Sequence, residues 1–199
     1  GTVMQATDTA LQAADMDAFG LAFAPLATMA CATSPLLAQK PFALTFEEAS
    51  TLPVVWSTVH TAMERAGSHK SSGILVHAAA GGVGSLLVEY GHWLGGGTMG
   101  TSGQPAKHRQ LRATNVLDSA SSRDGTAFAK GTLALLQGSR MDTLLNSLSL
   151  DFISVSFALL REGGTFGEIG KRAIWASPRH TASSPSTSYC AIALDADMA

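Results

Sequence analysis

The sequence predicts an α/β protein built on a doubly wound parallel sheet, and three observations support this. Short apolar runs of strand type alternate with helical segments of about 10–15 residues, which is the pattern of βαβ units. One of these units carries a glycine-rich turn between its strand and its helix, over residues 73–94. The composition, with 46% hydrophobic residues and 20 glycines in 199 positions, suits a compact α/β chain rather than a disordered one.

The N-terminal quarter of the chain predicts a different structure. Residues 1–38 are rich in Ala, Thr and small apolar residues, and predict weak β-structure broken by prolines. A helix is expected after Thr45, because Thr45 and Glu48 form the capping-box pattern. Pro53 allows a second helical start, and that helix is expected to end at Gly67.

Beyond Gly67 the chain alternates between predicted strands and helices. Strands are expected at 74–76, 98–101, 115–117, 143–146, 165–169 and 189–194, and helices at 85–94, 106–113, 125–137 and 152–160. Gly97 and Gly100 are expected to weaken the second strand, since glycine packs no side chain. The Ser-, Pro- and Thr-rich stretch 176–188 predicts a loop.

The turn that follows the 74–76 strand has the features of a pyrophosphate site, which indicates a Rossmann-type dinucleotide-binding fold. Bare backbone can approach phosphates at its first two glycines, and the third lets the helix pack closely on the strand. The helix N-terminus adds unpaired N–H groups and a favourable dipole. Ala79 stands where the first glycine of the usual pattern is found, so a purely structural turn is the alternative. The candidate cofactor-binding residues of the turn are Ala80, Gly81, Gly82, Val83 and Gly84.

The segment after the second predicted strand favours NADP over NAD. NAD-selective sites place an acidic residue about 20 positions after the glycines, and no acidic residue occurs from 92 to 117. Thr101 and Ser102 instead offer hydroxyls, and Lys107 a nearby cation, which suits a 2′-phosphate. The alternative is that Lys107 belongs to a solvated helix face.

Composition excludes several other classes of function. The net charge of −2 gives no electrostatic case for nucleic acid or acidic membranes. No apolar run reaches the ~18 residues of a membrane span, and no secretory signal begins the chain. The two cysteines lie far apart, so we expect a reducing, cytoplasmic setting. The histidines lack the spacing of a zinc site, so no metal is expected.

Several motifs, in a consistent order and spacing, carry a resemblance to a known family. They are Leu-Thr-Phe-Glu-Glu-Ala (44–49), Leu-Pro-Val-Val-Trp (52–56), Val-His-Ala-Ala-Ala-Gly-Gly-Val-Gly (76–84), Thr-Ser-Gly (101–103), Ser-Arg-Asp (122–124), Leu-Asn-Ser-Leu (145–148) and Gly-Glu-Ile-Gly-Lys-Arg (167–172). Together they resemble the enoyl reductase domains of type I polyketide synthases and animal-type fatty acid synthases. That family belongs to the zinc-independent medium-chain dehydrogenase/reductase superfamily.

The resemblance implies a domain organisation and a function. It makes residues 1–38 the C-terminal remnant of a GroES-like substrate domain, with its partial β segment. Residues 39–199 become a C-terminally incomplete Rossmann domain that binds NADPH. The implied reaction is hydride transfer to the β-carbon of an α,β-unsaturated acyl thioester, followed by α-protonation. The implied partners are an acyl carrier protein that holds the substrate, neighbouring synthase domains and a second copy of the parent synthase.

Two other functions use the same residues differently. A free-standing NADPH-dependent quinone or alkenal reductase would share the glycine turn, which quinone reductases also carry. A non-catalytic structural remnant that packs between synthase domains is the second alternative. The low content of charged residues, 14%, motivates it, because such a surface is expected to meet another domain.

The resemblance also implies roles for single residues. Lys171 and Asp195 correspond to residues proposed to act near the reacting centre, and the alternative is a surface ammonium and a loop carboxylate. Thr58 matches a threonine beside the nicotinamide, although a helix hydroxyl can also bond to its own turn. Asn146 would line the nicotinamide end or simply end its strand. Ile169 and Gly170, beside Lys171, are further cofactor-binding candidates, whereas His77 is interpreted as structural.

Overall fold

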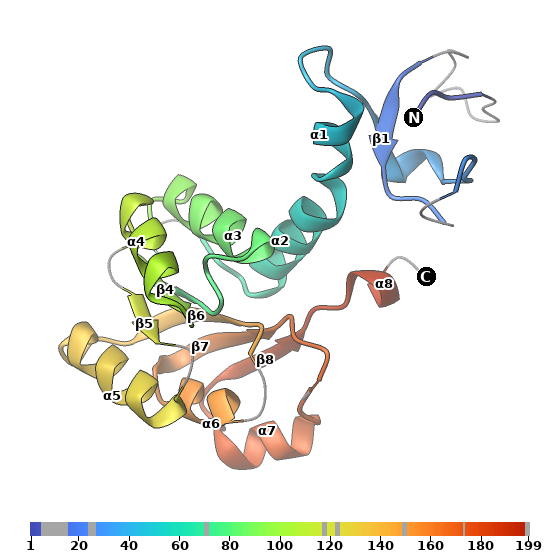
Figure 1. The fold of residues 1–199 in the computed structure, drawn as a ribbon. Helices are drawn as coiled ribbons and strands as arrows, with labels where there is room; N and C mark the ends of the chain where they lie inside the picture. The colour runs from blue at the N-terminus through green and yellow to red at the C-terminus, as the bar shows by residue number, and fades with distance from the viewer. Residues whose placement is uncertain are drawn as a thin grey trace. The chain divides into compact units, whose positions relative to one another are not determined.

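The computed structural model describes residues 1–4, 16–23, 27–69, 72–116, 119–121, 124–148, 151–172 and 174–197. They form two compact units, Gly1–Ser57 and Thr58–Ala199, and the division falls within helix α2 (Pro53–Arg65) (Figure 1). The domain boundary expected after residue 38 stays a prediction.

The first unit contains a small antiparallel sheet and a capped helix. Strands β1 (Ala18–Gly20) and β2 (Leu37–Gln39) pair, and the 3₁₀ turn η2 (Ser34–Leu36) precedes β2. Helix α1 (Phe46–Ser50) begins with the predicted capping box. The Glu48 amide donates to Thr45 Oγ1 at 3.1 Å, and the Thr45 amide donates to Glu48 Oε2 at 2.9 Å.

The second unit confirms the predicted doubly wound parallel sheet. Six parallel strands lie in the order β5-β4-β3-β6-β7-β8. The chain builds outward from β3 to β5 and then returns to add β6 on the other side of β3, which is the Rossmann strand order. The strands are β3 (Ile74–Val76), β4 (Thr98–Ser102), β5 (Ser119–Ser121), β6 (Met141–Asn146), β7 (Leu160–Glu168) and β8 (Ser188–Ala191).

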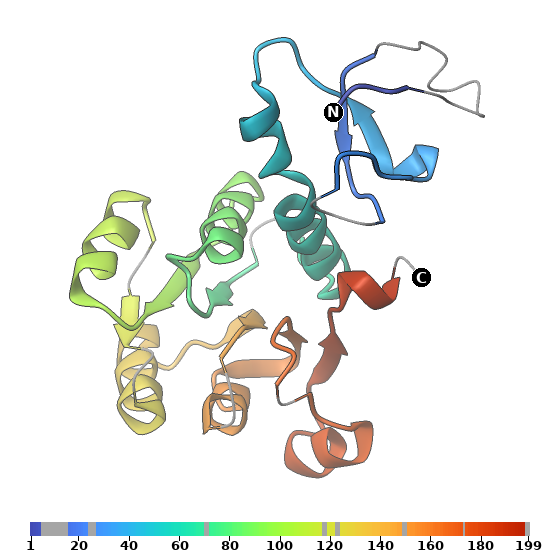
Figure 2. The same cartoon turned by 45° about the vertical axis from the view of Figure 1, so that its right-hand side comes forward.

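Helices cover both faces of this sheet (Figures 1 and 2). Because strand side chains alternate between faces, Ile74 and Val76 pack in one apolar cluster with α2, α3 and α4, while Leu75 packs in another with α5 and α6. The helices are α3 (Gly82–Trp93), α4 (Pro105–Ala113), α5 (Gly125–Leu136), α6 (Asp151–Phe157), α7 (Ser177–Ser183) and α8 (Leu194–Asp197). In the described part of the chain, every helix is too short or too polar to cross a membrane.

Four predicted elements differ most from the structure. The strand expected at 115–117 is wrong, because Asn115 takes a left-handed conformation (φ 55°) that ends α4, and the strand lies at 119–121. Position 117 itself lies outside the described residues. The helix expected to reach 160 ends at Phe157, since Leu160 pairs with Met141 and begins β7. Gly163 and Gly164, the glycines beyond the expected end of this helix, lie within β7, which pairs with β6.

The C-terminal region holds the other two differences. The predicted loop at 176–188 contains α7, which has Pro178 in its first turn and buries His180 against Phe157. The strand expected at 189–194 ends at Ala191, and Leu194 begins α8 instead. Both errors arise because polar or β-prone residues found tertiary partners that local composition does not reveal.

Candidate nucleotide and active site

The candidate site lies at the carboxyl edge of the sheet, where β3 and β6 are neighbours. From this pair the chain winds in opposite directions, and open α/β sheets bind ligands in the crevice at such a point. The predicted site residues of the second unit, apart from Thr58, follow or end parallel strands, so the structure brings them to this one edge. They are the turn after β3, Thr101 and Ser102 in the last two positions of β4, Lys107 in the helix that follows β4, Asn146 at the end of β6, the 169–171 segment after β7 and Asp195 after β8.

The glycine turn has the geometry of an anion cradle. Helix α3 begins at Gly82, and its N-cap, Gly81, has no side chain that could cap the helix and donates its amide to the Ala78 carbonyl at 2.9 Å. Gly81 and Gly82 are exposed, and a Cβ on Gly82 would meet nothing within 4 Å. A Cβ on Gly84 would lie 2.4 Å from the Ala78 carbonyl oxygen, so Gly84 is needed for close packing of helix on strand. Open N–H groups above a tightly packed helix start fit a pyrophosphate.

Strand β4 braces the turn through Thr101. The Ala78 amide donates to Thr101 Oγ1 at 3.1 Å, and the Ala79 amide donates to the Thr101 carbonyl at 2.9 Å. Thr101 is fully buried, and Ala78 is held at a φ of 49°, which non-glycine residues seldom adopt. The direct contact predicted between Thr101 and a nucleotide stays a prediction.

Gly100 has a packing role that the sequence did not indicate. It lies in the middle of the buried strand β4, and a Cβ there would be 2.7 Å from the Cβ of Ala79. The glycine therefore makes room for the alanine that replaces the first glycine of the turn. Gly100 thus has a packing role toward the turn, and the weakening of the strand expected from it stays a prediction.

The end of β4 offers polar groups suited to a nucleotide. Ser102 is 3% exposed, and no hydrogen-bond partner for its Oγ is found among the described residues. Such an orphaned hydroxyl beside the open turn is a fitting donor for a ribose or phosphate oxygen. Lys107 is exposed in the first turn of α4, three residues after Gln104.

A buried polar network connects β3, β6 and β7. Asn146 Nδ2 donates to both carboxylate oxygens of Glu168, at 2.8 and 3.0 Å, and His77 Nδ1 lies 2.6 Å from Asn146 Oδ1. The Gly170 amide donates to Glu168 Oε1 at 2.8 Å. Ser156 Oγ lies 3.4 Å from His77 Nε2. Sequence reasoning found His77 and Asn146 but missed the roles of Glu168 and Ser156. The only signal for Glu168 was an ionisable side chain inside the predicted strand 165–169.

Burial shifts the pKa values of the two ionisable residues in this network, His77 and Glu168, in opposite directions. Burial lowers the pKa of His77 to about 4, despite the favourable hydrogen bond with Asn146. Burial raises the pKa of Glu168 to about 7, against the hydrogen bonds from Asn146 and Gly170 that favour the charged form. His77 is therefore neutral, and Glu168 changes its charge near neutral pH.

The two residues expected near the reacting centre form an ion pair. Lys171 Nζ lies 2.6 Å from Asp195 Oδ1, and both side chains are exposed. The hydrogen bond and charge of Lys171 lower the pKa of Asp195. The structure thus places together an ammonium and a carboxylate that the sequence separates by 24 positions. Their catalytic roles stay predictions.

The remaining predicted residues surround this edge or support it. Thr58 is half-buried on α2. Ile169 packs against the apolar cluster of α2 and α3, and its amide donates to the Asn146 carbonyl at 2.8 Å. Asn146 is fully buried with its amide engaged in the network. Within the described ranges, no three His, Cys, Asp or Glu side chains gather where they could hold a metal ion.

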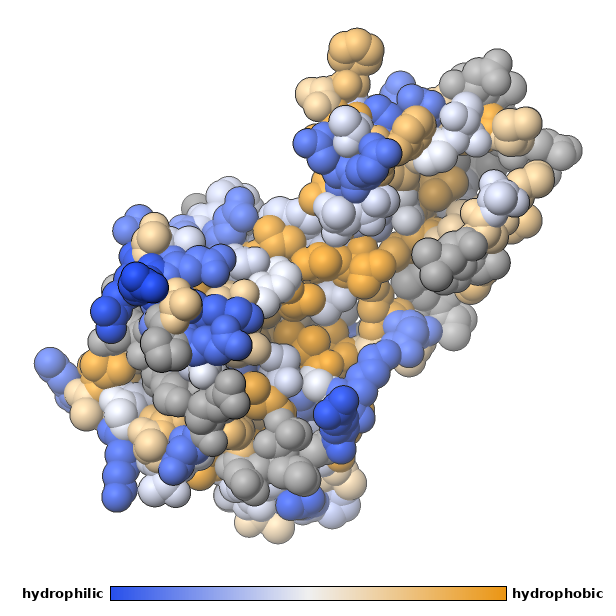
Figure 3. Space-filling view, in the orientation of Figure 1, coloured by the Kyte–Doolittle hydropathy of each residue, from blue (hydrophilic) through white to orange (hydrophobic). Residues whose placement is uncertain are grey.

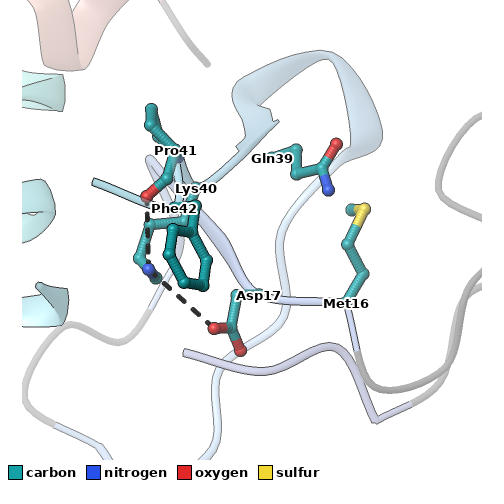
Figure 4. Close-up of a pocket in the computed structure, with 6 residues that line it drawn as sticks. All are labelled: Met16, Asp17, Gln39, Lys40, Pro41 and Phe42. Carbon is teal, nitrogen blue, oxygen red and sulfur yellow. Dashed lines mark hydrogen bonds and ion pairs between the residues drawn. The ribbon is translucent and has the colours of Figure 1, made fainter. Parts of the chain in front are cut away.

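A separate hollow lies wholly within the first unit (Figure 4). Its Lys40 ammonium is engaged by the Leu44 carbonyl at 2.7 Å and faces Asp17 at 3.9 Å. The same ammonium lies 5.1 Å from the centre of the Phe46 ring. The lysine therefore holds the chain turn before α1, and none of the predicted site residues lines this hollow. Its lining residues are Met16, Asp17, Gln39, Lys40, Pro41 and Phe42.

Strand order, glycine turn and orphaned hydroxyl define a Rossmann-type dinucleotide-binding domain, and the comparisons with known proteins narrow the class. A solved structure described as an enoyl reductase domain of a polyketide synthase is 30% identical, with a TM-score of 0.64, and the chain covers 80% of it. The chain belongs to the enoyl reductase domains of polyketide synthases. This is an oxidoreductase family, and it implies a nicotinamide cofactor.

Other relatives agree with this assignment. The CurK enoyl reductase structure is 31% identical with a TM-score of 0.76, covering 81% of this chain and 48% of that one. EryA2, the erythronolide synthase of Saccharopolyspora erythraea, is 37% identical over 79% of the chain. The polyketide synthase ZEA2 of Gibberella zeae is 39% identical over 67% of the chain. The chain spans only 5% and 6% of these two synthases. No protein-family model matches it.

Proposed function

We propose that the chain is the NADPH-dependent enoyl reductase module of a polyketide or fatty acid synthase. The observation that carries the proposal is the arrangement at the carboxyl edge of the sheet. The exposed glycine turn and the Lys171–Asp195 ion pair both lie beyond strand ends of the same parallel sheet. A cofactor seated on the turn and a substrate beside the ion pair would then share one crevice.

Several residues would hold the cofactor. The N–H groups of Gly82 and Val83, in the first turn of α3, suit the pyrophosphate. The Ser102 hydroxyl, which has no partner among the described residues, and the Lys107 ammonium suit the 2′-phosphate. Thr58, Ile169 and Gly170 would surround the nicotinamide end. When bound, NADPH supplies the hydride for the β-carbon of the enoyl thioester.

Lys171 and Asp195 would stabilise the negative charge that develops on the substrate and supply the proton that it takes up. As hydride reaches the β-carbon, negative charge develops on the thioester oxygen, and a nearby ammonium stabilises it. Lys171 can then give a proton to the α-carbon. The Asp195 carboxylate, with its lowered pKa, keeps that ammonium charged and fixes its position between turnovers.

The partners follow from the relatives. The matched proteins are multidomain synthases, and this chain matches only a small part of their length. The substrate would accordingly arrive on an acyl carrier protein, neighbouring synthase domains would flank the module, and a second copy would join through the parent synthase. The surface of low charge content fits such a setting.

The test measures NADPH oxidation in the presence of a crotonyl thioester. Replacing Lys171 by alanine should lower kcat by about 10²-fold while the Kd for NADPH changes less than about twofold, because the ammonium acts on the substrate. Lys130→Ala, which removes an exposed charge from α5, is the matched control.

Other results would favour the alternatives. Binding of NADPH without reduction of any enoyl thioester would contradict the reductase function. Reduction of quinones alone would point to the free-standing reductase. Failure to bind NADPH at all would support a structural remnant.

A further inference from the structure

Glu168 lies between two neighbouring strands, paired with Asn146 of β6 and Ala191 of β8. It is the last residue of β7 and is 1% exposed, yet its carboxylate reaches two donors, the Asn146 side-chain amide and the Gly170 backbone amide. A Cβ on Gly170 would lie 2.7 Å from Glu168 Oε1, so glycine is needed at this position for the carboxylate to fit. All of these contacts donate to the carboxylate, which only accepts.

The orientation of the Asn146 amide is fixed by the backbone. Leu148 N donates to Asn146 Oδ1 at 3.1 Å, and Asn146 Nδ2 donates to the Leu148 carbonyl at 2.8 Å. With Oδ1 identified as the acceptor, His77 Nδ1 must carry the proton it donates, which leaves Nε2 to accept from Ser156. One directed chain of hydrogen bonds therefore runs from Ser156 and His77 through Asn146 to Glu168.

We infer that Glu168 is a positioning residue of the nucleotide site. Its carboxylate holds the turn at Asn146–Leu148 and the Gly170 amide in one arrangement, so that the two segments proposed to receive the nicotinamide end keep a fixed geometry. The inference rests on the proposed function, because it assigns Glu168 an effect on cofactor affinity. Protonation removes the charge of the carboxylate and turns one acceptor oxygen into a donor, which weakens its hydrogen bonds with the Asn146 and Gly170 amides.

The surroundings define when this change occurs. Burial raises the pKa of Glu168 to about 7. Among the described residues, the ionisable groups near it include neutral His77, reached through Asn146, and Tyr189 and Cys190 on β8, whose own pKa values are raised by burial. Arg65 of α2 donates to the carbonyl of Ala191, the β8 residue paired with Glu168, at 3.1 Å. Lys171 follows three positions later on the chain and is paired with Asp195. None of these neighbours is a cation in contact with the Glu168 carboxylate.

The experiment measures the Kd for NADPH between about pH 6 and pH 8 in the wild type, in Glu168→Gln and in Glu162→Gln, an exposed glutamate of the same strand. The wild type and the control should bind about threefold to tenfold more weakly at the lower pH. Glu168→Gln should bind NADPH weakly at every pH in this range, and its Kd should show no change that can be assigned to titration of residue 168. NADH is measured alongside, since it lacks the 2′-phosphate, which itself titrates near pH ~6.

A second readout keeps the inference separate from the proposed function. The amide resonance of Gly170 should titrate with a midpoint near neutrality in the wild type without any cofactor. A titrating Gly170 with a pH-independent NADH affinity would overturn the positioning role and leave the reductase function intact. A wild type that binds neither nucleotide would overturn both. If Glu168→Gln does not fold, the pH dependence of the wild-type Kd for NADH and the titration of the Gly170 amide still test the positioning role.

Discussion

His77 and Glu168 are two buried ionisable residues joined by the amide of Asn146, and folding shifts their pKa values in opposite directions. A histidine with a lowered pKa adds stability above its ordinary pKa of 6.5 and loses it as pH falls towards about 4. A carboxyl with a raised pKa stabilises the fold below its ordinary value of 4.5 and loses this as pH rises to about 7. Each effect amounts to about 3 kcal/mol, so the two oppose one another across the acidic range.

Replacing Glu168 should therefore reveal the pH dependence of stability that His77 contributes. In Glu168→Gln the unfolding free energy should rise by about 2–3 kcal/mol between about pH 4.5 and pH 6.5, because only the His77 effect remains. In the wild type these two contributions should nearly cancel over that range. Urea unfolding at a series of pH values measures both profiles, with Glu162→Gln as control. A Glu168→Gln profile parallel to that of the wild type would contradict the assignment.

Lys107 is the residue on which the choice of nucleotide is expected to depend. Lys107→Ala should raise the Kd for NADPH by about fivefold to tenfold, about 1–1.4 kcal/mol, because only the 2′-phosphate needs that charge. The Kd for NADH should stay within about twofold of the wild-type value. Fluorescence titration of both nucleotides checks this, with Lys130→Ala as the matched loss of charge. An equal loss for both nucleotides would place Lys107 away from the 2′-phosphate.

At the scale of secondary-structure elements, the close approach of β4 to the glycine turn is the feature most open to test. Gly100→Ala should lower the unfolding free energy by about 1–3 kcal/mol, because its new Cβ would overlap that of Ala79. Ala79→Gly in the same chain should recover most of that loss. A double-mutant cycle by chemical denaturation measures the coupling. Equal costs in both backgrounds would show that the two positions do not interact.

Element prediction succeeded where a local signal was strong. The capping box at Thr45 and the sequence Gly81–Gly84 mark helix starts by chemistry that acts within a few residues, and both starts lie where expected or within three residues. It failed at 115–117 and at α7. There, strand pairing and the packing of His180 on Phe157 depend on residues distant in sequence.

At the scale of the whole molecule, the two units differ in their cores. Among the described residues, the buried hydrophobic side chains of Gly1–Ser57 are Ala18 and Ala49, whereas the second unit holds two extended apolar clusters. The first unit also exposes large apolar side chains, and hydrophobic residues are visible on the surface in Figure 3. The exposed ones in this unit are Met4, Phe23, Met29, Phe42, Phe46, Val54 and Trp56.

Hydrogen exchange should report this difference. In the isolated chain, amides of β1 and β2 should exchange at least about 10²-fold faster than those of β3 and β6, since a two-stranded sheet is marginal in water. Mass spectrometry of proteolytic peptides measures both regions in one experiment. Adding the parent synthase domains should slow exchange in the first unit if they cover its apolar side chains. Equal protection in the isolated chain would contradict this expectation.

The sequence by itself determined the class of fold and the glycine turn, and it placed the ends of β3 and β6 at Val76 and Asn146. Those features depend on local periodicity and on backbone freedom at single positions, which neighbouring residues reveal. Only the tertiary structure decided that Lys171 meets Asp195, that Glu168 serves Asn146 and Gly170, and that Gly100 makes room for Ala79. Apart from the contact between Glu168 and Gly170, which are two positions apart, these contacts join segments that are distant in the sequence and lie together only because the parallel strands pair in one sheet.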